Sequence, residues 1–139
     1  MNKAIEGSLV TIPAEGGVGV AKVIFLSEYF AETICLKIYK KRIPDAASIS
    51  VDDFSGPFDV FYTSLDGLKR KRWSIVAHEP VLDNERALTR RTSGGEIWVE
   101  DTHLGLARDA DLAALPKMLV YGGGLIEKNV NRYPLMMNR

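Results

Sequence analysis

The feature that most constrains this chain is a series of short strand patterns joined by glycine-containing turns in its first half. Residues 8–13 and 18–26 are apolar runs separated by residues 14–17, where two glycines can adopt the positive φ of a hairpin turn at little cost. In residues 31–39, Ile34, Leu36 and Ile38 recur with a period of two, which places them on one face of a strand. The first half of the chain therefore predicts consecutive, locally connected strands.

The rest of the chain continues this pattern with shorter and less regular segments. Strands are predicted over residues 57–63, 68–77, 96–100 and 103–107, a loop with a short helix over 82–92, and helices over 109–115 and 125–131. Residues 122–124, three glycines, read as a flexible connection. Regular alternation of strands and helices is missing, which argues against a parallel doubly wound fold. We expect one domain over residues 1–139, mainly β with short helices, built as a small antiparallel curled sheet or an SH3-like barrel.

Composition argues against several classes of protein. The 18 basic residues equal the 18 acidic residues, so the formal net charge is zero, whereas a dedicated nucleic-acid binder usually carries a basic excess. Cys35 is the only cysteine, so neither an internal disulfide nor a cysteine zinc site can form, and its apolar strand predicts a buried, unreactive thiol. No apolar run approaches the length of a membrane span, and residues 1–6 lack a signal core. We expect a cytoplasmic protein without a metal or other cofactor.

Two segments resemble a known family. Residues 7–13 (GSLVTIP), followed by a glycine-rich turn and residues 19–23 (GVAKV), resemble the opening of the immunity protein 26 family, and residues 72–81 (RWSIVAHEPV) resemble its later Trp-x-Ile-Val segment. Ala77 stands where the family pattern often has glycine. The resemblance implies a bacterial protein that binds and neutralises a cognate toxin by occlusion. It supplies no catalytic residues.

Charged strand ends and loops are the expected contact surface for such a partner. The densest basic run is Lys69, Arg70, Lys71 and Arg72, and a second run of Lys40, Lys41 and Arg42 would join it if the two strand ends lay together. Residues 90–91, two arginines, form a third, weaker basic site. These residues could meet an acidic toxin surface, since complementary charge speeds encounter and selects partners.

An acidic set and an aromatic pair are the other candidate contacts. Glu96, Glu100 and Asp101, with two further carboxylates at positions 83 and 85, could instead meet a basic toxin cleft. Tyr29 and Phe30 lie between two predicted strands, where an exposed aromatic pair could serve a partner. Trp73 and Trp98 are expected in the core.

Two other classes of function stay open from the sequence. The basic runs with nearby aromatic residues would suit a small-barrel nucleic-acid-binding module. An enzyme would have to use His78 or His103, but adjacent His78 and Glu79 on a strand point to opposite faces, and no metal-ligand spacing is present. The sequence therefore favours a binding protein over an enzyme and leaves its oligomeric state undetermined.

Overall fold

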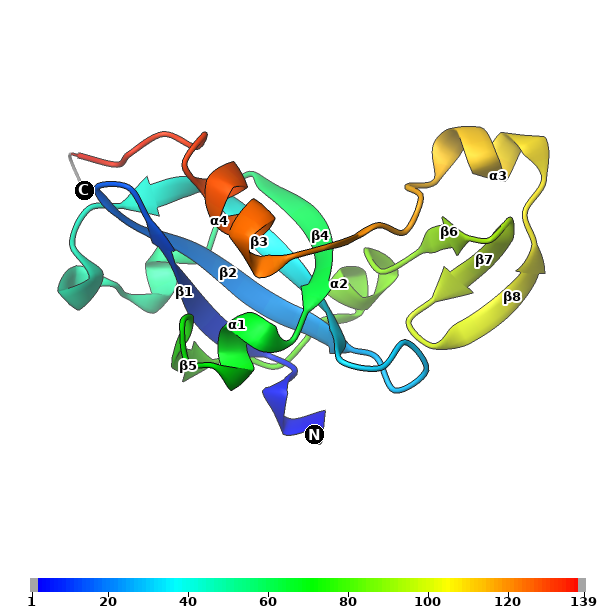
Figure 1. Ribbon diagram of the computed structural model, residues 1–139, viewed down its shortest axis with the longest axis horizontal. Helices are drawn as coiled ribbons and strands as arrows, with labels where there is room; N and C mark the ends of the chain where they lie inside the picture. Colours follow the sequence, from blue (N-terminus) through cyan, green and yellow to red (C-terminus); the bar gives the residue numbers. More distant parts are fainter. Residues whose placement is uncertain (1–2, 138–139) are drawn as a thin grey trace.

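The computed structural model describes residues 3–137, and these form two β-sheets with short helices on their faces (Figure 1). The large sheet has the strand order β5-β1-β2-β3-β4-β9, with bounds Ser8–Ala14 (β1), Gly17–Leu26 (β2), Thr33–Ile43 (β3), Phe58–Ser64 (β4), Ser74–His78 (β5) and Val120–Tyr121 (β9). The small sheet has the order β6-β7-β8, with bounds Arg91–Ser93, Glu96–Val99 and Thr102–Leu106. All neighbouring strands are antiparallel except β4 and β9.

The mainly β prediction is confirmed, and the large sheet stays open because its edge strands β5 and β9 do not pair with each other. Bulges interrupt the pairing of β1 with β5 and of β2 with β3, where they bend the strands and increase their twist. The sheet is therefore curled without closing into a barrel.

Short helices complete the fold. The α-helices are Asp66–Lys69 (α1), Asp83–Ala87 (α2), Asp109–Ala114 (α3) and Gly123–Val130 (α4), and single 3-10 turns span Lys3–Ile5 (η1), Ala46–Ser48 (η2) and Val51–Asp53 (η3). The helices predicted near residues 82–92, 109–115 and 125–131 are all present. The prediction that residues 122–124 form a flexible connection is wrong, because Gly122 caps α4 and the next two glycines lie in its first turn.

The chain around Trp73 also differs from the prediction of one strand over residues 68–77. Residues 66–69 form α1, Lys71 has a positive φ of 59°, and the strand begins only at Ser74. The indole of Trp73 packs directly on Gly67, where a Cβ atom would clash with it. This contact holds the chain in a turn and buries Trp73 to 2% exposure, so the expected core position of this residue is confirmed.

The core has two layers, one on each face of the large sheet. The α4 face holds the apolar alternation of β3 that the sequence predicts, packed against Ile126 and Val130 of α4. Val130 fits against Gly19, which leaves no space for a side chain on β2. The opposite face carries Cys35 and Tyr62 and is covered by α2 and the chain that follows it. The small sheet and α3 project to one side (Figure 1).

Candidate functional site

The densest basic run of the sequence lies on α1 and the loop after it, and half of it has partners within the chain. Lys69 pairs with Glu32, and Arg72 Nη2 lies 2.5 Å from Glu127 Oε1 on α4. Arg70 and Lys71 are exposed and have no carboxylate partner among residues 3–137. Arg72 therefore serves to hold α4 against the Trp73 turn, where Trp73 Nε1 donates to the same carboxylate at 3.0 Å.

The second basic run does not join the first. Lys40, Lys41 and Arg42 lie near the end of β3, whereas Lys69 pairs with the residue just before that strand begins. Seven strand residues separate the two ends by roughly 23 Å. Arg42 is also used internally, since Nε donates to the carbonyl of Tyr133 and Nη1 to that of Glu15, at 2.9 and 2.5 Å. Lys40 lies 3.5 Å from Asp59.

The expected acidic set is scattered and has structural partners. Glu96 Oε1 lies 3.2 Å from His103, and Glu100 Oε2 accepts a hydrogen bond from Arg86 at 2.8 Å. Asp101 accepts hydrogen bonds from the Ser27 hydroxyl and the Glu28 amide, at 2.6 and 2.7 Å, and so holds the loop between β2 and β3. Asp83, the other outlying carboxylate, is exposed at the start of α2.

The aromatic pair on that loop joins the two sheets. The Tyr29 and Phe30 rings lie 4.8 and 5.4 Å from the Trp98 ring of β7. Trp98 is buried, as expected, and Phe30 is half-buried beneath it, whereas Tyr29 is exposed. Phe30 therefore belongs to the junction between the sheets, and Tyr29 alone presents an open aromatic surface.

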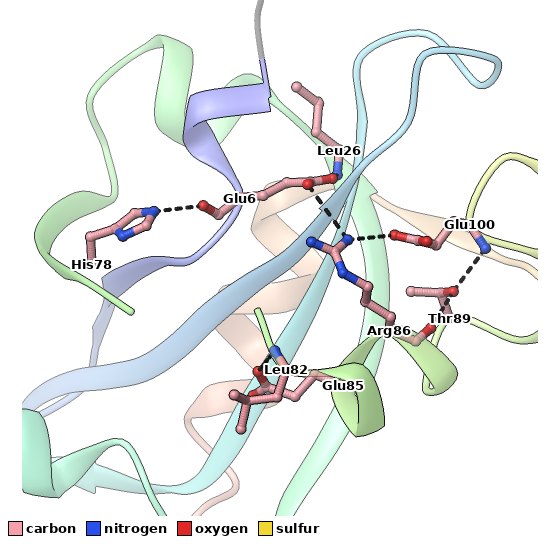
Figure 2. A network of polar contacts seen from close by, with 8 residues as sticks. All are labelled: Glu6, Leu26, His78, Leu82, Glu85, Arg86, Thr89 and Glu100. Carbon is pink, nitrogen blue, oxygen red and sulfur yellow. Dashed lines mark hydrogen bonds and ion pairs between the residues drawn. The ribbon is translucent and has the colours of Figure 1, made fainter. Parts of the chain in front are cut away.

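A polar network also connects the first residues of the chain to α2 and the small sheet (Figure 2). Arg86 of α2 lies between Glu100 and Glu6, at 2.8 and 3.8 Å, and Glu6 accepts the Leu26 amide at 2.9 Å. The Glu100 amide donates to the Thr89 hydroxyl at 2.8 Å, and Glu100 itself has a positive φ of 53°. These contacts fix the position of the chain that leaves α2.

Glu85 of α2 is buried, which excludes it from the acidic surface expected from the sequence. Its carboxylate accepts hydrogen bonds from Lys22 Nζ at 2.7 Å, from Lys37 Nζ at 3.1 Å and from the Leu82 amide at 2.9 Å. Burial alone would raise the pKa of Glu85, but these three hydrogen bonds outweigh it and hold the pKa below its ordinary value. Lys22 is also buried and donates to the Pro80 carbonyl.

Two grooves meet at β4, one on each face of the sheet, and together they form the strongest candidate site. Groove A, about 480 Å³, lies between β4, the end of α2 and residues 115–121; its apolar walls include Val60, Tyr62 and Leu119, and its cations are Arg90, Arg91 and Lys117. Groove B, about 280 Å³, lies between β4 and α4; it includes Leu125, Lys128 and Arg132. Phe61 and Tyr121 line both grooves, and their rings meet edge to face at 5.4 Å.

The charge of this surface is one-sided. Five cations line the two grooves, and among the described residues no Asp or Glu lines either one, although the chain as a whole carries equal numbers of acids and bases. Leu119 and Leu125 lie beside the cations and are 52% and 56% exposed. We call this combination of grooves A and B, with Arg90, Arg91, Lys117, Lys128 and Arg132, the basic groove surface.

Arg91 is the most unusual member of this surface because it is fully buried. Its Nη1 donates to the carbonyls of Thr89 and Glu100 at 3.2 and 2.5 Å, and its guanidinium carbon lies 4.9 and 5.5 Å from the centres of the Tyr62 and Phe30 rings. No carboxylate pairs with it, and within residues 3–137 its Nε and Nη2 have no hydrogen-bond partner. Groove A is thus lined by a buried guanidinium that two backbone carbonyls and two aromatic rings contact.

The remaining reactive side chains do not converge on these grooves. His78 contacts the Glu6 carbonyl at 2.8 Å, and neither histidine lines groove A or groove B. Burial raises the pKa of the Cys35 thiol to about 12, so it is protonated at neutral pH, as expected for a small buried side chain. Among residues 3–137, no three His, Cys, Asp or Glu side chains are placed to share a metal ion. None of the helices in this range is both long and apolar enough to cross a bilayer.

Comparison of the chain with protein-family models, curated proteins and solved structures finds no match in any of the three.

The basic groove surface is the part of the site that sequence reasoning ranked too low or missed. Residues 90–91 were expected to be only a weak basic site, and no sequence pattern connects Lys117, Lys128 and Arg132 with them. Residues 82–92 were predicted as a loop with a short helix, so no strand pattern was available to indicate that the Arg91 side chain is buried.

Proposed function

We propose that this protein is an immunity-type protein that binds a cognate bacterial toxin and neutralises it by occlusion, with the basic groove surface as its contact face. The class of function is suggested by the two segments that resemble the immunity protein 26 family. The observation that carries the choice of surface is the set of five cations around two apolar grooves with no lining carboxylate. The matching toxin surface would be acidic with apolar residues at its centre.

The composition of this surface suits a protein partner. Exposed Leu119 and Leu125 give apolar area that a partner can bury, and Phe61 and Tyr121 supply aromatic rings at the centre. Arg90, Lys117, Lys128 and Arg132 have no carboxylate partner among the described residues, so an acidic surface would gain their charge without breaking an internal ion pair. Charges at the rim of such an interface mainly raise the rate of association.

The nucleic-acid hypothesis rests on the two basic runs, and the structure weakens that basis. The runs lie at opposite ends of β3, and Lys69, Arg72, Lys40 and Arg42 are engaged within the chain. A nucleic-acid role would now have to use the basic groove surface as well. Binding to single-stranded or double-stranded nucleic acid at low salt, in preference to the toxin, would identify that role instead.

The experiment is co-expression with the toxin encoded beside this gene, followed by measurement of growth and of affinity. The double variant R90E/K117E reverses two exposed charges of groove A, and R70E/K71E reverses two exposed charges on the α1 loop as a matched control. We expect R90E/K117E to weaken binding by about 100-fold, at roughly tenfold per reversed charge, and to abolish protection. R70E/K71E should protect like the unmodified protein. Loss of protection only in R70E/K71E, or no binding by the unmodified protein, would contradict the proposal.

A further inference from the structure

The outer edge of β4 is unpaired over its first half. The Leu65 amide donates to the Glu32 carbonyl and the Lys40 amide to the Pro57 carbonyl, so the odd-numbered residues of β4 exchange hydrogen bonds with β3. In an antiparallel pair the residues between them point their backbone groups to the other side. The N–H and C=O groups of Phe58 and Val60 therefore face away from β3. Within residues 3–137 no strand pairs with them there.

This open edge exists because β9 begins to pair with β4 only at Tyr62. β9 pairs only with Tyr62 and Thr63. The residues just before it turn instead to the small sheet, where the Pro116 carbonyl accepts the Thr92 amide and the Met118 amide donates to the Thr92 carbonyl, at 2.9 and 2.8 Å. Figure 1 shows this segment running from α3 past β4 into α4. Groove A lies between the two diverging stretches of chain.

The two grooves lie where the side chains of an added strand would point. Successive side chains of a strand alternate between the two faces of its sheet. Val60 and Tyr62 belong to the face of groove A, whereas Phe61, which lines both grooves, packs against the core on the α4 face, where groove B lies. A strand laid beside residues 58–61 would therefore place alternate side chains next to Arg90 and Lys117 on one face and next to Lys128 and Arg132 on the other.

We propose that this edge binds an extended acidic segment of the partner, which adds to the large sheet as a strand beside residues 58–61. Exposed strand edges recruit extended peptides in this way, with backbone hydrogen bonds giving affinity and alternate side chains giving specificity. The acidic character follows from the cations of both grooves. The one carboxylate on β4, Asp59, is already engaged by the Tyr133 hydroxyl at 2.6 Å and by Lys40. That the segment belongs to a toxin rests on the proposed function, whereas the strand addition does not.

The strand addition is tested first by amide hydrogen exchange with a peptide probe that needs no toxin. The probe is a peptide of repeating Glu-Glu-Val-Val, which carries glutamate on both faces of a strand; the controls are its lysine–valine counterpart and the same glutamate–valine peptide with an N-methyl group on every amide. In the free protein, the Phe58 and Val60 amides should exchange faster than those of Asp59 and Phe61. The glutamate–valine probe at millimolar concentration should slow the first two at least about tenfold, and neither control should do so.

Several outcomes would overturn the proposal. These are equal binding by the N-methylated peptide, no protection of Phe58 and Val60 by the probe, or protection of both amides in the free protein through pairing with a second copy. A variant of the full chain adds a test that includes the toxin. V60P removes one outward-facing donor and leaves the bonds to β3, and V60T keeps that donor with a similar shape. We expect V60P, and not V60T, to weaken toxin binding at least about tenfold. If the toxin binds both variants equally, strand addition fails while the proposed function stands.

Discussion

Two groups of basic residues lie close to α2 and differ in whether a carboxylate pairs with them. Near its start, Glu85 accepts hydrogen bonds from Lys22 and Lys37, so two cations on the sheet are paired with a buried carboxylate. Just beyond its end, Arg90 and Arg91 have no carboxylate partner among the described residues and line groove A. The first group is part of what holds α2 on the sheet. In the second, Arg91 is buried behind the groove, and the exposed Arg90 is charge that the fold leaves available to a partner.

The largest expected effect comes from breaking the paired group. E85Q leaves buried Lys22 without its counter-charge, and removing one partner of a buried ion pair costs about 3–5 kcal/mol. We expect a loss of that order in the free energy of unfolding, measured with urea. D83N, two positions away on the same helix and exposed, is the control and should unfold like the unmodified protein. An E85Q variant of unchanged stability would show that the Glu85 contacts do not hold α2.

The paired group should also make stability depend on acid. The pKa of Glu85 is lower in the fold than its value of roughly 4.3 in an unfolded chain. The stability that it contributes is therefore fully present above about pH 4.3 and is lost as the pH falls through the folded pKa. Urea unfolding measured from pH 6 downward should show this loss in the unmodified protein. The slope that Glu85 adds below about pH 4.3 should be absent in E85Q, and an identical acid profile would contradict the assignment.

Salt should separate the unpaired group from the paired one. Exposed charges are screened over a Debye length of about 10 Å at 0.1 M salt, whereas buried pairs are screened much less. Raising salt should therefore slow association with the proposed toxin partner several-fold, as stopped-flow mixing would record. R90Q/K117Q should reduce that dependence, with R70Q/K71Q as the control. The unfolding free energies of all three proteins should change little with salt. An unfolding free energy that responds to salt as strongly as the association rate would contradict this separation of paired from unpaired charge.

The smallest effect is expected at the exposed pair of Lys69 and Glu32. Each group shifts the pKa of the other toward its charged form, yet both side chains lie in water. Surface ion pairs contribute little to stability. E32Q should therefore leave the melting temperature and the affinity for the proposed toxin partner unchanged. A clear fall in either value would contradict the assignment of Lys69 and Glu32 as a weak surface ion pair.

The sequence predicted much of the large sheet and little of the site. The alternation of Ile34, Leu36 and Ile38 depends only on local pattern, and the structure buries all three on one face. The short length of the β4–β9 pairing depends instead on the hydrogen bonds that Thr92 makes with residues 116 and 118, which are contacts between distant segments. No local pattern carries that information, so the open edge of β4 could not be predicted.

Buried charges could also not be paired from the sequence, although Lys22 gives a partial signal. Lys22 stands alone among apolar residues in β2, and a lone lysine in a buried strand requires a buried partner. That signal was present in the sequence, but it does not name Glu85, which lies 63 residues away. The cations of the basic groove surface come from residues 90–91 at the start of β6, the segment before β9, and α4 with the residues just after it, so only the fold brings them together.

The most direct test of the basic groove surface is a hydrogen-exchange footprint of this protein with its proposed partner, a toxin encoded beside its gene. Binding should protect residues 58–61, 115–121 and 125–132, which form the first half of β4 and the walls of the two grooves. Residues 66–72 and 40–42, the basic runs that stand out in the sequence, should exchange as in the free protein. Protection confined to those two runs, with β4 and the grooves unchanged, would contradict this prediction.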